Sequence, residues 1–194
     1  MVLRIRGEGL VEGLQVGGLP DGTVDNDTLA AGTPNTAALP AGSILQVVKN
    51  QKLDVTSDTT TSAWTDFTGC TVTITPTDAS NRIIGIFSFS HGASSFDFIR
   101  NFRAVRGTTV VSDVPSTGVQ STISRVRDLH DNNGANYSSF IFDDDLTGYT
   151  SGSITYQLQY YATQAGTYYI NRSSANTAEW GQGASTFIAI EVAA

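Results

Sequence analysis

Apolar side chains recur at every second position through most of the chain that follows Ser43. The clearest example is the segment Ile-Thr-Tyr-Gln-Leu-Gln-Tyr at 154–160, where large apolar residues alternate with Thr and Gln. A period of two puts neighbouring side chains on opposite faces of a β-strand, so this segment predicts a strand with one buried face. Segment 82–89 begins with apolar residues on both faces, which indicates a strand at the centre of a sheet. This alternation restricts residues 43–194 to an all-β fold.

Turn-forming residues interrupt the alternation often enough to divide it into about nine short strands. We expect strands in the segments 44–48 (continuing through Leu53 and Val55), 71–75, 82–89, 96–105, 119–126, 137–142, 153–161, 166–171 and 186–192. Regular short strands with turn signals, and no amphipathic helix between them, are typical of sandwiches and barrels. A jelly roll fits this number of strands best. The prediction for residues 43–194 is therefore a jelly-roll-like antiparallel β-sandwich.

Residues 1–42 differ in composition and are predicted to form an extended N-terminal arm. Glycine is frequent in the first half of this segment, and Gly32, Pro34 and Pro40 prevent regular secondary structure in the second half. Such a segment cannot offset its conformational entropy by burying its own side chains. We expect it to become ordered on another surface, as an anchoring arm whose contacts are made by apolar residues spaced along it: Leu3, Ile5, Leu10, Leu14, Val16 and Leu19.

The charge and hydropathy of the chain argue against two kinds of partner. Only 15% of the residues are charged, the net charge is −7, and the two lysines are Lys49 and Lys52. Such a surface is repelled by polyphosphate, so no nucleic-acid partner is expected. No segment approaches the ~18 consecutive apolar residues that span a bilayer, and residues 1–7 lack the apolar core of a signal peptide. We expect synthesis in a cytoplasm and no membrane insertion.

Few side chains of this sequence are of the types that carry out chemistry. The single cysteine, Cys70, alternates with apolar residues and is predicted to be a small core residue. His91 lies near Ser90 and Asp97, but the Gly-x-Ser-x-Gly elbow that exposes a nucleophilic serine is missing, so we interpret His91 as a turn or interface histidine. No catalytic residue, metal site or cofactor is predicted, and the chain is not expected to be an enzyme.

Three adjacent carboxylates, Asp143, Asp144 and Asp145, follow the apolar segment 139–142. Together with loop carbonyls such groups can bind calcium. However, consecutive side chains of a strand point to opposite faces, so all three reach one ion only if a turn intervenes. A solvated loop or a set of salt-bridge partners is the better interpretation.

Arginines are concentrated in two short segments of a chain that is otherwise poor in positive charge. Arg100, Arg103 and Arg106 recur at every third position, and Arg125 and Arg127 follow later. They are either ordinary solvated strand ends or partners for acidic residues of a neighbouring subunit. In the second case we expect a symmetric subunit interface formed by Arg100, Arg103 and Arg106 with Asp143, Asp144 and Asp145.

Aromatic residues gather in the last third of the chain, and Trp180 stands apart among them because glycines place it in a predicted loop, Glu-Trp-Gly-Gln-Gly at 179–183. An exposed aromatic ring can stack on a sugar ring or pack between subunits. Trp180 is therefore the candidate glycan contact. A polysaccharide hydrolase would need a pair of carboxylates in a cleft, and the sequence identifies none.

Several short motifs, taken in their order and spacing, resemble a known family. They are Leu-Pro-Ala-Gly-Ser-Ile-Leu-Gln-Val-Val (39–48), Trp-Thr-Asp-Phe-Thr-Gly-Cys-Thr-Val-Thr-Ile-Thr-Pro (64–76), Ser-Asn-Arg-Ile-Ile (80–84), Phe-Arg-Ala-Val-Arg-Gly (102–107), Tyr-Ile-Asn-Arg (169–172) and Gly-Ala-Ser-Thr-Phe-Ile-Ala-Ile-Glu-Val (183–192). Together they resemble a module of bacteriophage virion proteins from phages of aquatic bacteria, of the tail-fibre, minor structural or head-decoration type. The arm segment 18–30 resembles the stretch that often precedes this module. The similarity spans almost the whole chain.

The resemblance implies a non-enzymatic β-sandwich, often trimeric, on the outside of a virion. Fibre proteins usually contain a long shaft or coiled coil, and this chain has none. A trimeric capsid decoration (cement) protein, bound by its arm to the major capsid protein or to tail proteins, is therefore the expected function. The alternative is a tail fibre or receptor-binding protein that recognises a host surface polysaccharide.

Overall fold

The elements of the fold are β-strands throughout the part of the chain that the structure describes. The structure is a computed structural model that describes residues 4–5, 11–12, 39–94, 99–112, 124–127, 135–175 and 182–194. Within these ranges no helix is long and apolar enough to cross a membrane. The chain divides into two units, Met1–Leu39 and Pro40–Ala194, so the division falls slightly before the expected boundary at residue 42. In the first unit β1 (Arg4–Ile5) and β2 (Val11–Glu12) form an antiparallel pair.

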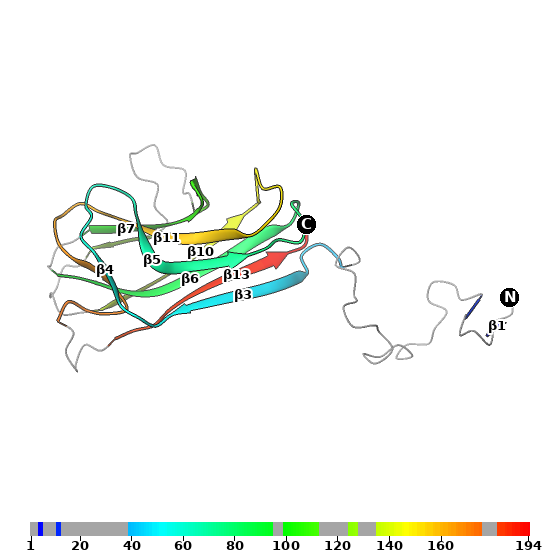
Figure 1. Cartoon of the computed structure of the whole chain (residues 1–194), viewed down its shortest axis with the longest axis horizontal. Coiled ribbons are helices and arrows are strands. Elements are labelled where there is room, and N and C mark those ends of the chain that lie inside the picture. The colour runs from blue at the N-terminus through cyan, green and yellow to red at the C-terminus, as the bar shows by residue number, and fades with distance from the viewer. Residues whose placement is uncertain are drawn as a thin grey trace. The chain divides into compact units, whose positions relative to one another are not determined.

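The second unit contains two antiparallel sheets (Figure 1). The β6 sheet consists of β3 (Ile44–Lys52), β4 (Thr56–Asp58), β6 (Arg82–Ala93), β10 (Asn136–Asp144), β12 (Tyr168–Ile170) and β13 (Ser185–Val192). The β11 sheet consists of β5 (Thr65–Ile74), β7 (Ile99–Arg106), β8 (Thr109–Val110), β9 (Ser124–Arg127) and β11 (Ile154–Ala162).

The order of the strands is that of a jelly roll. In one sheet β3, β13, β6 and β10 are neighbours, and in the other β5, β11, β7 and β9 are neighbours. Counted along the chain, these eight strands pair in the orders first-eighth-third-sixth and second-seventh-fourth-fifth, which two Greek keys wound together produce. The short strands β12 and β4 extend the β6 sheet beyond the end of β13. The predicted all-β sandwich of jelly-roll type is confirmed.

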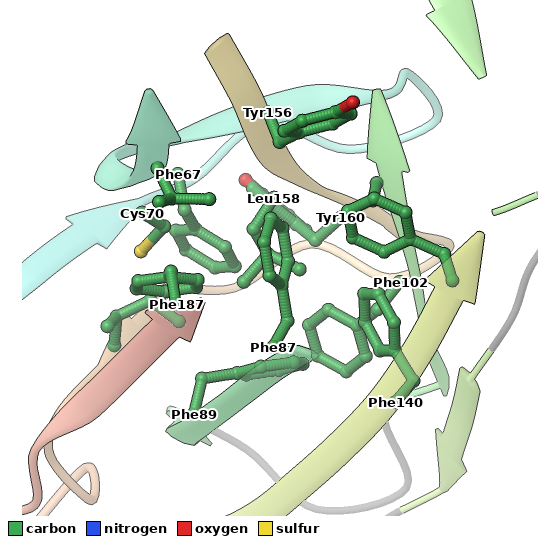
Figure 2. Close-up of a cluster of buried hydrophobic side chains, with 14 of the residues drawn as sticks. Phe67, Cys70, Phe87, Phe89, Phe102, Phe140, Tyr156, Leu158, Tyr160 and Phe187 are labelled. Atoms are coloured by element: carbon green, nitrogen blue, oxygen red, sulfur yellow. The ribbon is translucent and has the colours of Figure 1, made fainter. Parts of the chain in front are cut away.

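The core lies between the two sheets and is rich in aromatic rings (Figure 2). As the alternation predicted, Tyr156, Leu158 and Tyr160 of β11 are fully buried, and β6 is central because it pairs with β10 on one side and with β13 and β12 on the other. The ring of Phe87 packs edge-on against Phe187, with centroids 4.9 Å apart. Facing alternate residues of both sheets therefore form one continuous apolar layer.

Strand β5 begins earlier than the alternation indicated. The expected strand began at residue 71, whereas β5 begins at Thr65 and buries both Phe67 and Cys70. These two residues are three positions apart, because the register with β11 shifts between Gln157 and Gln159 and Gly69 adopts a φ of +78°. A bulge of this kind breaks the period of two, which hides the first half of the strand from a periodicity analysis. The prediction that Cys70 is a core residue is confirmed, and its burial raises the pKa of the thiol to about 12.

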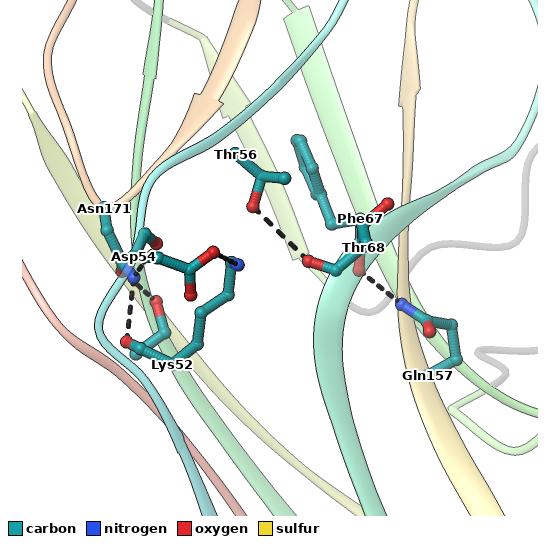
Figure 3. A network of polar contacts seen from close by, with 8 residues as sticks. Lys52, Asp54, Thr56, Phe67, Thr68, Gln157 and Asn171 are labelled. Carbon is teal, nitrogen blue, oxygen red and sulfur yellow. Dashed lines mark hydrogen bonds and ion pairs between the residues drawn. The ribbon is translucent and has the colours of Figure 1, made fainter.

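A buried asparagine lies where strand β6 stops pairing with β13 and begins to pair with β12 (Figure 3). The side-chain amide of Asn171 donates hydrogen bonds to the carbonyl oxygens of Lys52 (2.8 Å) and Asp54 (3.0 Å), in the gap between β3 and β4. Its side-chain oxygen accepts a hydrogen bond from the hydroxyl of Ser185 (2.6 Å) at the start of β13. Asn171 has a φ of +64°, a conformation that asparagine tolerates better than most residues. One side chain thus satisfies backbone groups that the broken ladder leaves unpaired.

Candidate interaction surfaces

The arginine and aspartate residues predicted to meet across an interface come together partly within one chain. The guanidinium of Arg106 on β7 donates to Asp144 at the end of β10 over 2.6 and 3.2 Å, and also to the carbonyl oxygen of Thr147 (2.9 Å). Asp144 is buried and accepts a further hydrogen bond from the hydroxyl of Tyr156 (2.8 Å). The Arg106–Asp144 pair therefore lies inside one chain at one end of the sandwich, and is neither a solvated strand end nor, as the alternative prediction had it, a contact between subunits.

The other two carboxylates of the Asp143–Asp145 run point elsewhere. Asp143 lies on the outer face of the β6 sheet and is paired with Arg82 of the neighbouring strand. Asp145 accepts a hydrogen bond from the backbone N–H of Thr147 (2.9 Å), which closes a turn and lowers the pKa of this carboxyl. As expected from the alternation of a strand, the three groups do not converge, and no cluster of metal-ligating side chains occurs among the described residues.

Two residues singled out in the sequence are buried at the opposite end of the sandwich. His91 lies inside β6, not in a turn, and its Nε2 is 2.8 Å from the hydroxyl of Ser138. Its ring contacts those of Phe89 and Phe102. Burial, together with the nearby charge of Arg100, holds the pKa of His91 well below its usual value, so the imidazole is neutral. The turn assignment was wrong because the strand continues to Ala93. Arg100 is also buried and is not exposed to a neighbouring subunit in this conformation.

Arg103 lies in a polar and aromatic cluster on the outer face of the β11 sheet. Its guanidinium carbon is 4.1 Å from the centroid of the Trp64 ring, and its Nε donates to Gln159 (2.7 Å). The amide of Gln159 in turn donates to Asp66 (2.7 Å), and the ring of Tyr161 lies beside Trp64 with centroids 5.6 Å apart. We call these five residues the Trp64 cluster. Next to it is a shallow depression of about 420 Å³, lined in part by Asp66 and Gln157.

The outer face of the β6 sheet carries a group of aliphatic side chains that extends across its four long strands, next to a polar row of Gln51, Thr186, Ser88 and Ser139. Cross-strand pairing aligns Lys49, Ile188, Ile86 and Ile141 in one row, and Val47, Ile190, Ile84 and Asp143 in the next. A third row contains Ile44, Val192 and Arg82. We call the aliphatic members of these rows the aliphatic face: Ile44, Val47, Ile84, Ile86, Ile141, Ile188, Ile190 and Val192.

Much of the aliphatic face is open to solvent in the single chain. Ile44, Val47 and Ile141, which lie on the outer strands β3 and β10, are 62%, 57% and 62% exposed. The five residues on β6 and β13 are half-buried. In antiparallel sandwiches the outer face of a sheet is usually polar, as it is in the β11 sheet. A continuous outward aliphatic surface is the exception, and it is the kind of surface that marks contact sites.

The aliphatic face was not recognised from the sequence, although its signal was present. Apolar residues on both faces of segment 82–89 were taken as evidence of a central strand. That inference was correct for β6, but the same pattern also meant that the outward side chains were apolar. The other predicted site residues cannot be placed: Trp180 and the arm residues Leu3, Leu10, Leu14, Val16 and Leu19 lie outside the described residues, and of Ile5 only the backbone in β1 is described.

Comparison with known proteins adds no relative: no protein-family model matches the chain, and no curated protein matches it significantly. Inferences about function therefore rest on the fold and on these two outer faces.

Proposed function

We propose that this chain is a non-enzymatic structural protein of a bacteriophage virion, a homotrimeric capsid decoration (cement) protein whose N-terminal arm binds the major capsid protein or a tail protein. The virion assignment is supported by the resemblance of the sequence motifs, and the observation that carries the assembly role is the aliphatic face of the β6 sheet. Eight outward aliphatic side chains in adjoining rows form the kind of surface that the components of an assembly use for contact.

Four polar groups of the kind that can carry out chemistry support a structural role, because they are held inside the sandwich. Arg106, Asp144 and Tyr156 are tied to one another inside the core, and His91 is enclosed between phenylalanine rings. Groups held in this way stabilise the fold and are not presented to a substrate.

The anchoring role of the arm is supported by its composition, since Leu and Val residues separated by glycines gain contact area on a surface without forming a core. Several arms on one trimer would bind with avidity.

The test of the anchoring role is recovery of the protein on purified particles after deletion of residues 1–35. We expect the full chain to remain with the particles through gradient purification and the deleted chain to be lost. The deletion leaves the jelly-roll unit intact, and circular dichroism of the purified variant checks that it is folded. Undiminished recovery would remove the anchoring role, and absence of the full chain from particles would contradict the proposal as a whole.

A second candidate function, recognition of a host surface polysaccharide, is favoured by the Trp64 cluster. Aromatic rings stack on the apolar faces of sugars, and the chain of hydrogen bonds from Arg103 through Gln159 to Asp66 holds polar groups in fixed directions beside a depression of suitable size. If this function is correct, fluorescently labelled protein binds host cells and Trp64→Ala or Trp180→Ala weakens the binding. Tyr169→Ala is the matched control. The guanidinium carbon of Arg172 is 4.4 Å from the centroid of the Tyr169 ring, so this variant removes the same kind of arginine–aromatic contact outside the Trp64 cluster. Labelling of particle heads only would favour decoration.

A further inference from the structure

We infer that the aliphatic face of the β6 sheet is buried against other copies of this chain, in a closed ring in which the β3 edge of one copy meets the β10 edge of the next. The inference rests on the proposed assembly role and adds the surface and the partner. Its first support is continuity. The eight aliphatic side chains occupy three adjoining rows across four strands, a region of about 19 Å by about 20 Å, with Lys49, Arg82 and Asp143 at its rim. An apolar patch of this size with a charged rim is typical of a contact surface.

The shape of the surface favours another sheet face as the partner. The side chains of the aliphatic face stand in regular rows on long paired strands, as on the flat face of a sheet. In a closed ring of copies that meet edge to edge, these faces turn towards the common axis, where their side chains pack against one another. Every copy of this chain carries the same aliphatic face, so a homo-oligomer always contains a second apolar surface of equal size.

The distribution of charge indicates how the copies meet. Lys49 lies on β3 at one edge of the aliphatic face, and Asp143 lies on β10 at the opposite edge, one row away. A contact that sets the β3 edge of one copy beside the β10 edge of the next brings Lys49 close to the partner's Asp143. Such a contact is head-to-tail, and repeated head-to-tail contacts produce a ring when the rotation closes. Asp143 is also paired with Arg82 in its own chain, yet its side chain remains 46% exposed.

The edges of the sheet support the same arrangement. Among the described strands β10 is paired only with β6, and β3 only with β13. Both are therefore edge strands that border the aliphatic face, and exposed sheet edges are places where proteins tend to associate. A ring built through these edges covers the aliphatic side chains and the two edge strands together.

The test is the mass of the purified full-length chain, measured by sedimentation equilibrium over a range of concentrations. We expect a trimer for the wild type and a monomer for Ile86→Lys, with the dissociation constant raised by about 100-fold or more, because a charge is left unpaired in an apolar contact. The matched control is Thr155→Lys, at an exposed position on the outer face of the other central strand, β11; it should remain a trimer. A monomeric wild type overturns the inference, and a dimer overturns the ring.

A second set of variants keeps the test decisive if Ile86→Lys does not fold. Lys49→Glu and Asp143→Lys should each raise the dissociation constant by about tenfold, and the double variant should restore it towards the wild-type value because the two charges meet between copies. If the two effects simply add, the edge pairing is refuted. These measurements need no virus particle, so a failed ring is distinguishable from a failed virion assignment, which is tested by recovery on particles.

Discussion

The two sheets of the sandwich are alike on their inner faces and unlike on their outer faces. Inside, both contribute large apolar residues, such as Phe87 from β6 and Tyr160 from β11, to one core. Outside, β11 presents Thr155 and Gln159, whereas β6 presents Ile84 and Ile86. The inner faces are dictated by folding, because both must exclude water. Folding alone places no such demand on an outer face, so the difference between the two outer faces indicates what each one contacts.

The largest expected effect separates the two faces of a single strand. Phe87→Ala should lower the free energy of unfolding by about 4 kcal/mol, since it opens a cavity among packed rings. Ile86→Ala, one position away on the outer face, should cost about 1 kcal/mol in the monomer. Urea unfolding at a concentration where the chain is monomeric measures both. Equal losses would mean that Ile86 is enclosed within the single chain, and the contrast between the two faces would disappear.

The next effect compares adjacent carboxylates of β10. Asp144→Ala should destabilise the chain by about 3 kcal/mol, because it leaves the guanidinium of Arg106 enclosed without its partner. Asp143→Ala removes an exposed ion pair with Arg82 and should change the stability of the monomer by less than about 0.5 kcal/mol. Thermal unfolding of both variants distinguishes the inward group from the outward one. A large loss for Asp143→Ala at low concentration would contradict its assignment to intermolecular contact.

A smaller effect, with a pH dependence, concerns the inward carboxylate of β13. Glu191 is buried; burial raises its pKa, but hydrogen bonds from Gln46, Asn81 and Thr77 outweigh this and leave the pKa below its usual value. Glu191→Gln should therefore cost about 2 kcal/mol at neutral pH. Because the folded pKa is lowered, this contribution is present above the unfolded pKa of about 4.5 and is lost as the pH falls through the folded value.

The difference in stability between wild type and Glu191→Gln should thus shrink on acidification below about pH 4.5, as measured by urea unfolding across a pH series. A difference that is independent of pH would show that the carboxylate charge contributes nothing.

The smallest effect is expected on the polar outer face. Trp64→Ala removes a half-buried ring and its contact with Arg103, and should cost about 1 kcal/mol or less. It should leave the oligomeric state unchanged, in contrast to Ile86→Lys on the other face. Sedimentation of the Trp64→Ala variant checks this, and dissociation into monomers would place the subunit contact on the β11 sheet instead.

The sequence predicted features that depend on local periodicity and could not predict those that depend on three-dimensional proximity. The burial of Tyr156, Leu158 and Tyr160 followed from alternation, and so did the divergence of Asp143 and Asp144. Arg106 and Asp144 were expected to meet only between subunits; they lie 38 positions apart, and their pairing within one chain could not be identified without the topology.

The role of Asn171 could not be predicted from the sequence either, because its side chain bridges a gap between β3 and β4 that exists only in the folded sheet. The aliphatic face is an intermediate case. Its residues were noticed, but the sequence does not show whether an apolar strand face is covered by a second layer of the same chain or left open.

Coverage of the aliphatic face in the native protein is tested most directly by hydroxyl-radical footprinting of the full-length chain. Ile141 on the aliphatic face and Leu53 away from it are 62% and 63% exposed in the single chain, so they form an internally matched pair. If copies associate through this face, Ile141 is oxidised much more slowly than Leu53 at high protein concentration and becomes reactive on dilution. Equal oxidation of the two residues at every concentration would show that the face is open and would contradict the proposed assembly.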